Sequence, residues 1–184
     1  MHPLFAYSRL HHSALIQYDV SRTPSAQTVM DCTTHSPVPA NTLAQAATDP
    51  PTAAPDQLLL GSHKFPWTIV VKAGSPYPSN KKTKHSGSRS PVTGTLITNL
   101  DVLYAIHTTL IAQVTSEEWE ALGEGSTAER KVTRAYEKRC SVMGDWEGGV
   151  RRVDWLGGKT HLIGIEVDRI SGHNIGKLVF ARIS

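Results

Sequence analysis

The stretch at residues 97–112, ITNLDVLYAIHTTLIA, is the strongest structural signal in the sequence, and it predicts one amphipathic helix. Thr98 is suited to the N-cap, and Asp101 three residues later can complete a capping box near the positive end of the helix dipole. Apolar and aromatic positions then recur every three or four residues, which is typical of a helix face that packs on a core. These positions are Leu100, Leu103, Tyr104, Ile106, His107, Leu110 and Ile111.

Two further helices are predicted directly after this one, because the capping-box pattern occurs twice more. One begins at Thr115 with Glu118 three residues later, and the other begins at Ser126 with Glu129 three residues later. We expect the last helix to run to about Cys140. Its basic side chains are expected mostly on the face opposite its apolar ones: Arg130, Lys131, Arg134, Lys138 and Arg139.

The remaining regular structure is predicted as strands towards the two ends of the chain. β-Branched and aromatic residues between turn signals mark these segments. The expected strands are 15–20, 58–60, 67–71, 151–156, 160–167 and 177–183. Gly157-Gly158 is expected to be a two-residue hairpin turn. Because strands, helices and strands follow in that order, we predict an α+β fold. Its antiparallel sheet has five to six strands built from N- and C-terminal segments, with the three helices packed on one face.

Length and local composition suggest how the chain is organised. A chain of 184 residues fits a single domain, 1–184. Segment 25–56 contains five prolines, so we expect an irregular wrap over the core surface, with one short helical turn at 43–47. Residues 61–91 hold six basic and no acidic side chains. Within them, segment 74–91 is rich in Lys, Ser, Gly and Pro and is expected to be a flexible basic loop.

Several classes of protein are disfavoured by composition. Cys32 and Cys140 are far apart and form no CxxC pair, so reduced thiols in the cytoplasm are the default expectation. No run of 18 apolar residues occurs, and the N-terminus lacks the continuous apolar segment of a secretory signal. The basic loop has no interleaved aromatic residues to stack on bases. We therefore predict a soluble cytoplasmic protein that binds neither membranes nor nucleic acids.

Six motifs in a fixed order give the sequence a resemblance to a known family. They are HPLFAYS near the start, YDVS at 18–21, ATDPP at 47–51, FPWTIVV at 65–71, DVLYAIH at 101–107 and GVRRVDWLGGKTHLIGI at 149–165. With them the chain resembles a family of uncharacterised domains abundant in mushroom-forming (basidiomycete) fungi. The resemblance covers most of the chain, with 74–91 as the least typical part. It implies a single domain of fungal origin, and it supplies no activity and no site residues.

Neither a nucleotide-binding loop nor a metal site is complete in the sequence. The GGKT segment at 157–160 is similar to the end of a phosphate-binding loop, but Val153 stands where that loop needs a glycine, and a strand is expected to follow instead of a helix. The nine histidines form neither HxH nor HExxH. A site assembled from distant residues such as His11, Asp19 and His161 stays open. We predict no cofactor and no metal.

A pocket between the helix at 97–112 and the sheet is the main candidate site. The side chains expected to line it and to contact a small apolar ligand are Trp67, Tyr104, His107 and Trp155. The polar groups available there for acid–base chemistry are Tyr104, His107, Arg152, Asp154 and His161. Structural roles stay open for two of them. A His at the position of His107 is more often a hydrogen-bonded core side chain than a ligand contact, and Asp154 is suited to a cross-strand ion pair with Arg152.

No complete catalytic pattern is present, which favours a soluble intracellular ligand- or protein-binding domain without catalytic machinery of its own. Two other functions stay open. One is a small cofactor-free enzyme of fungal accessory metabolism that uses the acid–base groups of the helix–sheet pocket. The other is self-assembly into a homo-oligomer through a strand edge such as 177–183.

Overall fold

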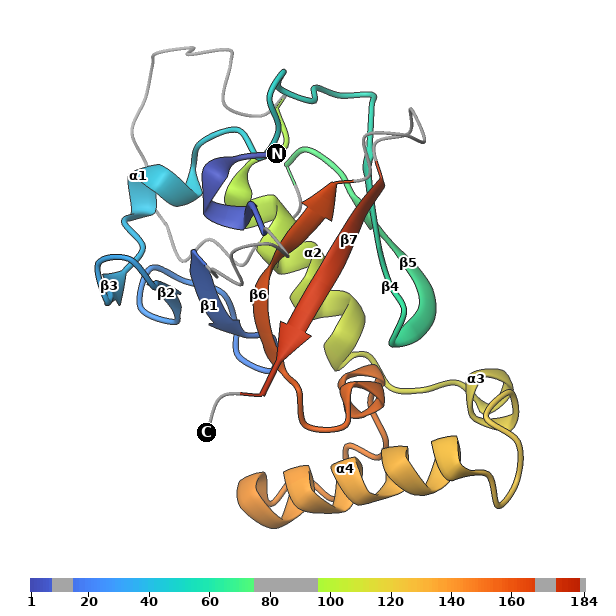
Figure 1. Cartoon of the computed structure of the whole chain (residues 1–184). Helices are drawn as coiled ribbons and strands as arrows, with labels where there is room; N and C mark the ends of the chain where they lie inside the picture. The colour runs from blue at the N-terminus through green and yellow to red at the C-terminus, as the bar shows by residue number, and fades with distance from the viewer. Residues whose placement is uncertain (8–14, 75–95, 168–174, 183–184) are drawn as a thin grey trace, which may run out of the picture.

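The computed structural model describes residues 1–7, 15–74, 96–167 and 175–182 (Figure 1). Its helices are α1 Ala40–Leu43, α2 Asn99–Ile111, α3 Ser116–Glu120 and α4 Thr127–Met143, with 3-10 turns at η1 Pro3–Phe5 and η2 Arg152–Leu156. Its strands are β1 Ile16–Asp19, β2 Val29–Asp31, β3 Ser36–Pro37, β4 Leu58–Ser62, β5 Phe65–Val71, β6 His161–Val167 and β7 Ile175–Ala181. The predicted flexible loop at 74–91 lies outside the described residues except for Gly74.

The seven strands form one sheet in the order β3-β2-β1-β6-β7-β4-β5. All neighbours pair antiparallel except β4 and β7, which run parallel with Leu59 opposite Ile175. Both ends of the chain contribute strands, as predicted, and the α+β class is confirmed. A purely antiparallel sheet of five to six strands is wrong, because the sheet is larger and contains this parallel pair. The additional strands β2 and β3 are three and two residues long, and their conformation depends on sheet pairing, of β2 with β1 and of β3 with β2.

The edges of the described sheet are β3 and β5. The strand edge suggested at 177–183 corresponds to β7, which lies inside the sheet between β6 and β4. Self-assembly through that strand is therefore not supported by its position. No helix of the described part of the chain has the length and apolar character to cross a bilayer.

Helix α2 is the helix predicted at 97–112, and it packs across the sheet near β5 and η2 (Figure 1). The capping box is confirmed. Thr98 Oγ1 accepts a hydrogen bond from Asp101 N at 3.1 Å, and Asp101 Oδ2 accepts one from Thr98 N at 2.8 Å. Leu103 and Ile106 are fully buried. Because each buried aliphatic side chain stabilises a fold by about 1.5–3 kcal/mol, this helix anchors the core.

Helices α3 and α4 lie beyond one end of the sheet in Figure 1, so the predicted packing of three helices on one face is wrong. Helix α4 packs mainly against η2. Its buried residues are Val132 and Cys140, which is too narrow an apolar face to cover a sheet. The described residues also form four α-helices where three are predicted, since α1 is an additional short one.

The start signals of α3 and α4 are found at the predicted residues. Thr115 caps α3 in a complete box with Glu118. Ser126 Oγ accepts a hydrogen bond from Glu129 N at 3.0 Å, but the Glu129 carboxylate accepts from Gly125 N. The third capping box is therefore incomplete. Helix α4 continues past Cys140 to Met143 and ends at Gly144, whose φ of 72° favours glycine.

The strand predicted at 151–156 is wrong, because these residues form η2. Val153, Asp154, Trp155 and Leu156 are buried in succession, whereas a strand would turn alternate side chains outward. The Asp154 carboxylate accepts a hydrogen bond from Arg151 N at 2.9 Å and so closes the turn locally. Gly157-Gly158, with positive φ angles of 59° and 79°, ends η2 and makes no hairpin.

Segment 25–56, where an irregular wrap is expected, contains β2, β3 and α1. Helix α1 ends at Leu43, where the predicted turn at 43–47 begins. The segment is fixed to the start of α2 by hydrogen bonds from Ala47 N to Ile97 O at 2.9 Å and from Asn99 Nδ2 to Thr42 O at 2.8 Å. The wrap therefore holds the N-terminal end of α2 in place.

Candidate functional site

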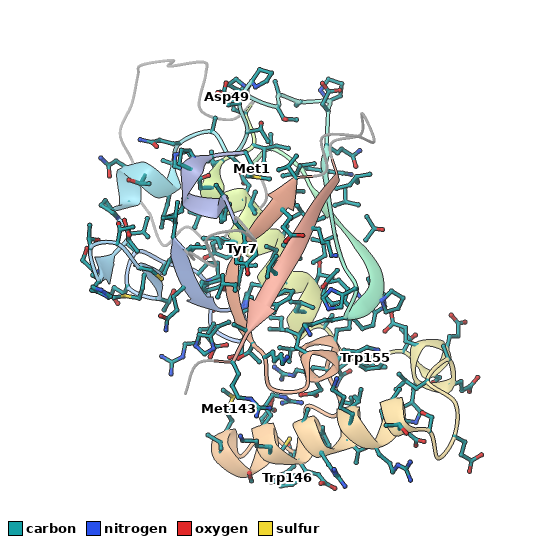
Figure 2. The ribbon with its side chains drawn as sticks, in the orientation of Figure 1. Met1, Tyr7, Asp49, Met143, Trp146 and Trp155 are labelled. Atoms are coloured by element: carbon teal, nitrogen blue, oxygen red, sulfur yellow. The ribbon has the colours of Figure 1, made fainter. Side chains whose placement is uncertain are left out.

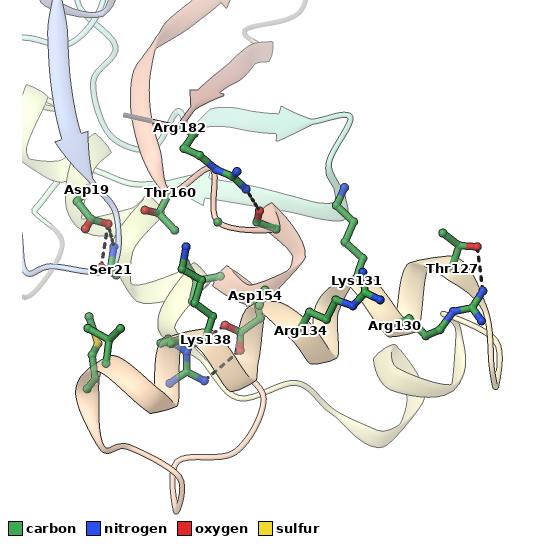
Figure 3. Close-up of a pocket in the computed structure, with 17 residues that line it drawn as sticks. Asp19, Ser21, Thr127, Arg130, Lys131, Arg134, Lys138, Asp154, Thr160 and Arg182 are labelled. Carbon is green, nitrogen blue, oxygen red and sulfur yellow. Dashed lines mark hydrogen bonds and ion pairs between the residues drawn. The ribbon is translucent and has the colours of Figure 1, made fainter. Parts of the chain in front are cut away.

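A groove of about 910 Å³ runs along α4 (Figure 3). Helix α4 forms one wall over its whole length, from Thr127 to Met143. The opposite wall is made by the end of β1, by the loop that follows η2 and by Arg182 after β7. We call this feature the α4 groove. It brings together segments that are more than 100 residues apart in the sequence.

Positive charge dominates the lining of the α4 groove. Its basic side chains are Arg130, Lys131, Arg134, Lys138, Arg139 and Arg182, and its acidic ones are Asp19 and Asp154. In Figure 3, Lys131 and Lys138 extend from α4 towards the opposite wall, and Arg182 reaches down from above. Among the described lining residues, six cations stand against two carboxylates, which gives this part of the groove a net positive field.

The two carboxylates are both engaged in local contacts. Asp154 is 3% exposed and accepts from Arg139 Nε and Nη2, each at 3.0 Å. This partner raises the pKa of Arg139 above its ordinary value, since the hydrogen bonds to Asp154 favour the charged guanidinium. Asp19 Oδ1 accepts from Ser21 N at 3.1 Å and from Ser21 Oγ at 2.8 Å. Within the described residues, Lys131, Arg134 and Lys138 form no ion pair with a carboxylate.

Cations also crowd near one end of the groove. Lys64, in the turn between β4 and β5, has its pKa lowered by burial and then by the positive charges of Lys159 and Lys131. On α4, Arg130 and Lys131 lie close to the helix N-terminus, where the helix dipole disfavours cations. The structure therefore holds several like charges close together, an arrangement that is electrostatically unfavourable.

The loop after η2 approaches α4 closely at Gly157. A Cβ atom added there would lie 2.7 Å from Lys131 Cε, and the φ of 59° also favours glycine. Arg182 Nη2 donates a hydrogen bond to Gly157 O at 3.2 Å. Close packing of Gly157 against the aliphatic part of the Lys131 side chain therefore sets the separation of the two walls.

The groove becomes apolar at the C-terminal end of α4. Val142 is 77% exposed and Met143 is 56% exposed, and both line the groove. Figure 2 shows Met143 and Trp146 on opposite sides of α4. Trp146 packs edge-on against Tyr136, with ring centroids 5.8 Å apart. No aromatic side chain is among the described residues that line the groove.

Two of the predicted pocket residues do come together. Trp67 and Trp155 make an edge-on contact with ring centroids 5.2 Å apart. The Arg152 guanidinium lies 5.0 Å from the centroid of the Trp67 ring and pairs with Glu118 at 2.5 Å. Burial works against the charge of Glu118, but hydrogen bonds from Arg152 and Thr115 N hold its pKa below the ordinary value. The ion pair suggested between Arg152 and Asp154 is not formed. Arg152 pairs with Glu118, and Asp154 pairs with Arg139.

The other predicted site residues lie elsewhere. His107 is 6% exposed on α2, and its Nδ1 lies 2.9 Å from Val20 O, which matches the suggested place in the core. Tyr104, also on α2, is half-buried. His161 begins β6, opposite Asp19. Of the five proposed acid–base groups, Asp154 lines the α4 groove and the other four do not.

His11, one residue of the suggested distant metal site, lies outside the described residues. Within the described part of the chain, no group of three His, Cys, Asp or Glu side chains is placed to hold a metal ion.

Sequence reasoning missed the cations of α4 as a site. They were expected on the outer face of a helix, which is normally a solvated surface. One signal was present: Arg130, Arg134 and Lys138 follow one another at intervals of four residues. The opposite wall has no such signal, because it arises from the ends of β1 and β7 and from the loop after η2.

Comparisons with known proteins place the chain in a family. No curated protein and no solved structure matches it. The sequence model of a family of unknown function, DUF6699, matches residues 16–173. The matched range contains α4, η2 and the loop that faces them. The chain therefore belongs to the family of unknown function DUF6699.

Proposed function

We propose that the protein is a binding domain that holds an anionic partner in the α4 groove. The observation that carries this proposal is the lining of the groove. Lys131, Arg134 and Lys138 stand on one helix face with no described carboxylate paired to them. Such a cluster attracts anions and raises their local concentration at the surface.

The size of the groove supports a ligand site. Its volume of about 910 Å³ lies near the upper end of the range found for ligand pockets, roughly 300–1,000 Å³. Its walls are also fixed in place. Arg139 ties α4 to Asp154 in η2, and Arg182 ties its own wall to Gly157. A preformed groove loses less conformational entropy when a partner binds.

The repulsion between the cations of the groove also supports an anion-binding function. Like charges four residues apart on a helix destabilise it by about 0.2–0.5 kcal/mol a pair. Arg130–Arg134 and Arg134–Lys138 are two such pairs. Residues that lower stability without a compensating contact in the free protein are typical of binding surfaces. An anion in the groove would turn this repulsion into attraction.

The remaining features of this proposal come from the sequence. We infer a single domain of fungal origin that works in the cytoplasm. An apolar ligand near Trp67 and Trp155 stays a prediction, as does acid–base catalysis by Tyr104, His107 and their proposed partners. Neither accounts for the α4 groove, which an anion-binding function does.

Titration calorimetry with inorganic tripolyphosphate tests the proposal. The groove variant combines Lys131→Gln, Arg134→Gln and Lys138→Gln, and the matched control combines Arg22→Gln, Lys72→Gln and Lys177→Gln, all outside the groove. Both variants remove three positive charges. We expect the groove variant to bind at least about tenfold more weakly than wild type, since three charged contacts are lost. Equal weakening in both variants, or no binding by wild type at low salt, would overturn the proposal.

A further inference from the structure

Four side chains on α4 form one row along the groove, and each is one helical turn from the next. They are Arg130, Arg134, Lys138 and Val142, and all four line the groove. Four residues of an α-helix advance by about 6 Å. The row therefore presents three cations and then an apolar side chain at nearly regular intervals, and Met143 broadens its apolar end.

An extended peptide has nearly the same repeat. Alternate side chains of a strand point the same way, and two residues of a strand advance by about 6.6 Å. Long Lys and Arg side chains readily take up the remaining difference at each step. The wall formed by the 17 residues of α4 is about 25 Å long, which is the length of roughly seven extended residues.

From this match we propose that the anionic partner is an extended peptide segment. It carries acidic side chains at every second position, followed in the same alternation by an apolar side chain that contacts Val142 and Met143. This inference rests on the proposed anion-binding function of the α4 groove and names its class of ligand. If the peptide runs parallel to α4, its apolar residue is the last in sequence. If it runs antiparallel, its apolar residue is the first.

Two observations favour a peptide over a single-stranded nucleic acid, which also carries charges at a regular repeat. Proteins that bind single strands stack bases on aromatic side chains, and none of the described groove residues is aromatic. The groove is also not uniformly basic. Val142 and Met143 replace the cations at one end, and Asp19 stands on the opposite wall. An unbroken phosphate backbone would meet both, whereas a peptide can place an apolar residue there.

Fluorescence anisotropy with labelled seven-residue peptides tests the register. The two alternating peptides are Glu-Ala-Glu-Ala-Glu-Ala-Leu and its reverse. The control Glu-Glu-Glu-Ala-Ala-Ala-Leu has the same composition and charge but clusters its acids. We expect one alternating peptide to bind at least about fivefold more tightly than the control, a difference well above the error of such titrations. A smaller difference would overturn the proposed register.

The apolar end is tested separately. Replacing the peptide's Leu by Ser should weaken binding to wild type by about fivefold, as expected for partial burial of one aliphatic side chain. The double variant Val142→Ser and Met143→Ser should lose this preference, and Val70→Ser, on exposed β5, should keep it. Val142 and Met143 are exposed, so their replacement leaves the core intact. An equal preference in the double variant and wild type would overturn the proposed contact.

The outcomes separate this inference from the proposed function. Binding of tripolyphosphate without any preference between the peptides overturns the peptide inference and leaves anion binding in place. Tighter binding of a single-stranded oligothymidylate than of either alternating peptide also overturns the peptide inference. Loss of all binding at low salt overturns both.

Discussion

Arg139 on α4 and Asp154 in η2 form a buried, two-pronged ion pair. Arg139 Nε donates to Asp154 Oδ1 and Nη2 donates to Asp154 Oδ2, both at 3.0 Å. The side chains are 10% and 3% exposed. Arg139 Nη2 also donates to Gly149 O at 2.8 Å. Since the buried apolar residues of α4 are Val132 and Cys140, this pair carries much of the attachment of the helix to the rest of the protein.

Replacing Asp154 by Asn should lower the free energy of unfolding by about 3 kcal/mol, because the Arg139 guanidinium loses its buried carboxylate partner and keeps only the partly exposed Asp145. Urea denaturation followed by tryptophan fluorescence measures this loss. Asp145→Asn is the control, since Asp145 pairs with Arg139 at 3.2 Å but is 34% exposed. We expect about 1 kcal/mol or less there. Similar losses for the two variants would show that the pair with Asp154 does not hold α4.

Replacing His107 by Ala should lower the free energy of unfolding by about 2–4 kcal/mol. The ring fills a buried site on α2, and its Nδ1 lies 2.9 Å from Val20 O, so the change opens a cavity and leaves a carbonyl without its partner. Thr108→Ala, on the exposed side of the same helix, should change it by less than about 0.5 kcal/mol. An unchanged stability in His107→Ala would contradict a core role and return the residue to the acid–base candidates.

Stability should fall at alkaline pH through Tyr18. Its side chain is fully buried on β1, and its hydroxyl donates a hydrogen bond to Arg22 O. Burial raises the pKa of Tyr18 far above its ordinary value, and the charge of Asp19 adds to this. The folded protein therefore keeps a proton that the unfolded chain releases above about pH 10. Below that pH the stabilisation is complete, and it is lost as the pH rises.

Thermal unfolding of wild type and Tyr18→Phe between about pH 9 and 11 checks this dependence. The variant should be about 1 kcal/mol less stable at neutral pH, because it lacks the hydrogen bond to Arg22 O. Its stability should then decline less with pH than that of wild type. Parallel declines would rule out Tyr18 as the source.

Replacing Arg134 by Gln should stabilise the free protein slightly while it weakens binding. Arg134 has three like charges within three or four residues on α4, Arg130, Lys131 and Lys138, against one opposite charge, Glu137. The change therefore removes a net repulsion, each pair being worth about 0.2–0.5 kcal/mol. The gain should be seen in urea denaturation at low salt and should vanish near 1 M salt, where the Debye length is about 3 Å. Arg22→Gln, outside the groove, should show no such salt dependence. A loss of stability at both salt concentrations would mean that Arg134 makes a stabilising contact.

The parts of the fold that were predictable depend on local chemistry. Thr98 with Asp101 and Thr115 with Glu118 fix helix starts through contacts three residues apart, and both boxes are present. The segment at 151–156 alternates like a strand, yet it forms η2. Asp154 closes this turn through Arg151 N and also pairs with Arg139, which lies on another element. The alternation of residues 151–156 contains no information about Arg139.

The candidate site shows the same division. The cations of α4 are visible in the sequence, but only the fold reveals that they face another wall of the protein. Arg182 and Gly157 reach that wall from β7 and from the loop after η2. Trp67 and Trp155 contact each other, while Tyr104 and His107 do not line the groove. Contacts between distant segments determine both the formation of the α4 groove and the positions of the predicted pocket residues.

The position of β6 and β7 in the sheet has a consequence for synthesis of the protein. Strand β1 pairs with β6, and strand β4 pairs with β7. The group β1–β3 and the pair β4–β5 are therefore connected in the sheet only through β6 and β7. On the ribosome, each group emerges before the partner that completes it. Each then exposes a strand edge of the kind that promotes aggregation. Nascent chains stalled ahead of β6 should accordingly depend on chaperones, and chains released with β7 should not.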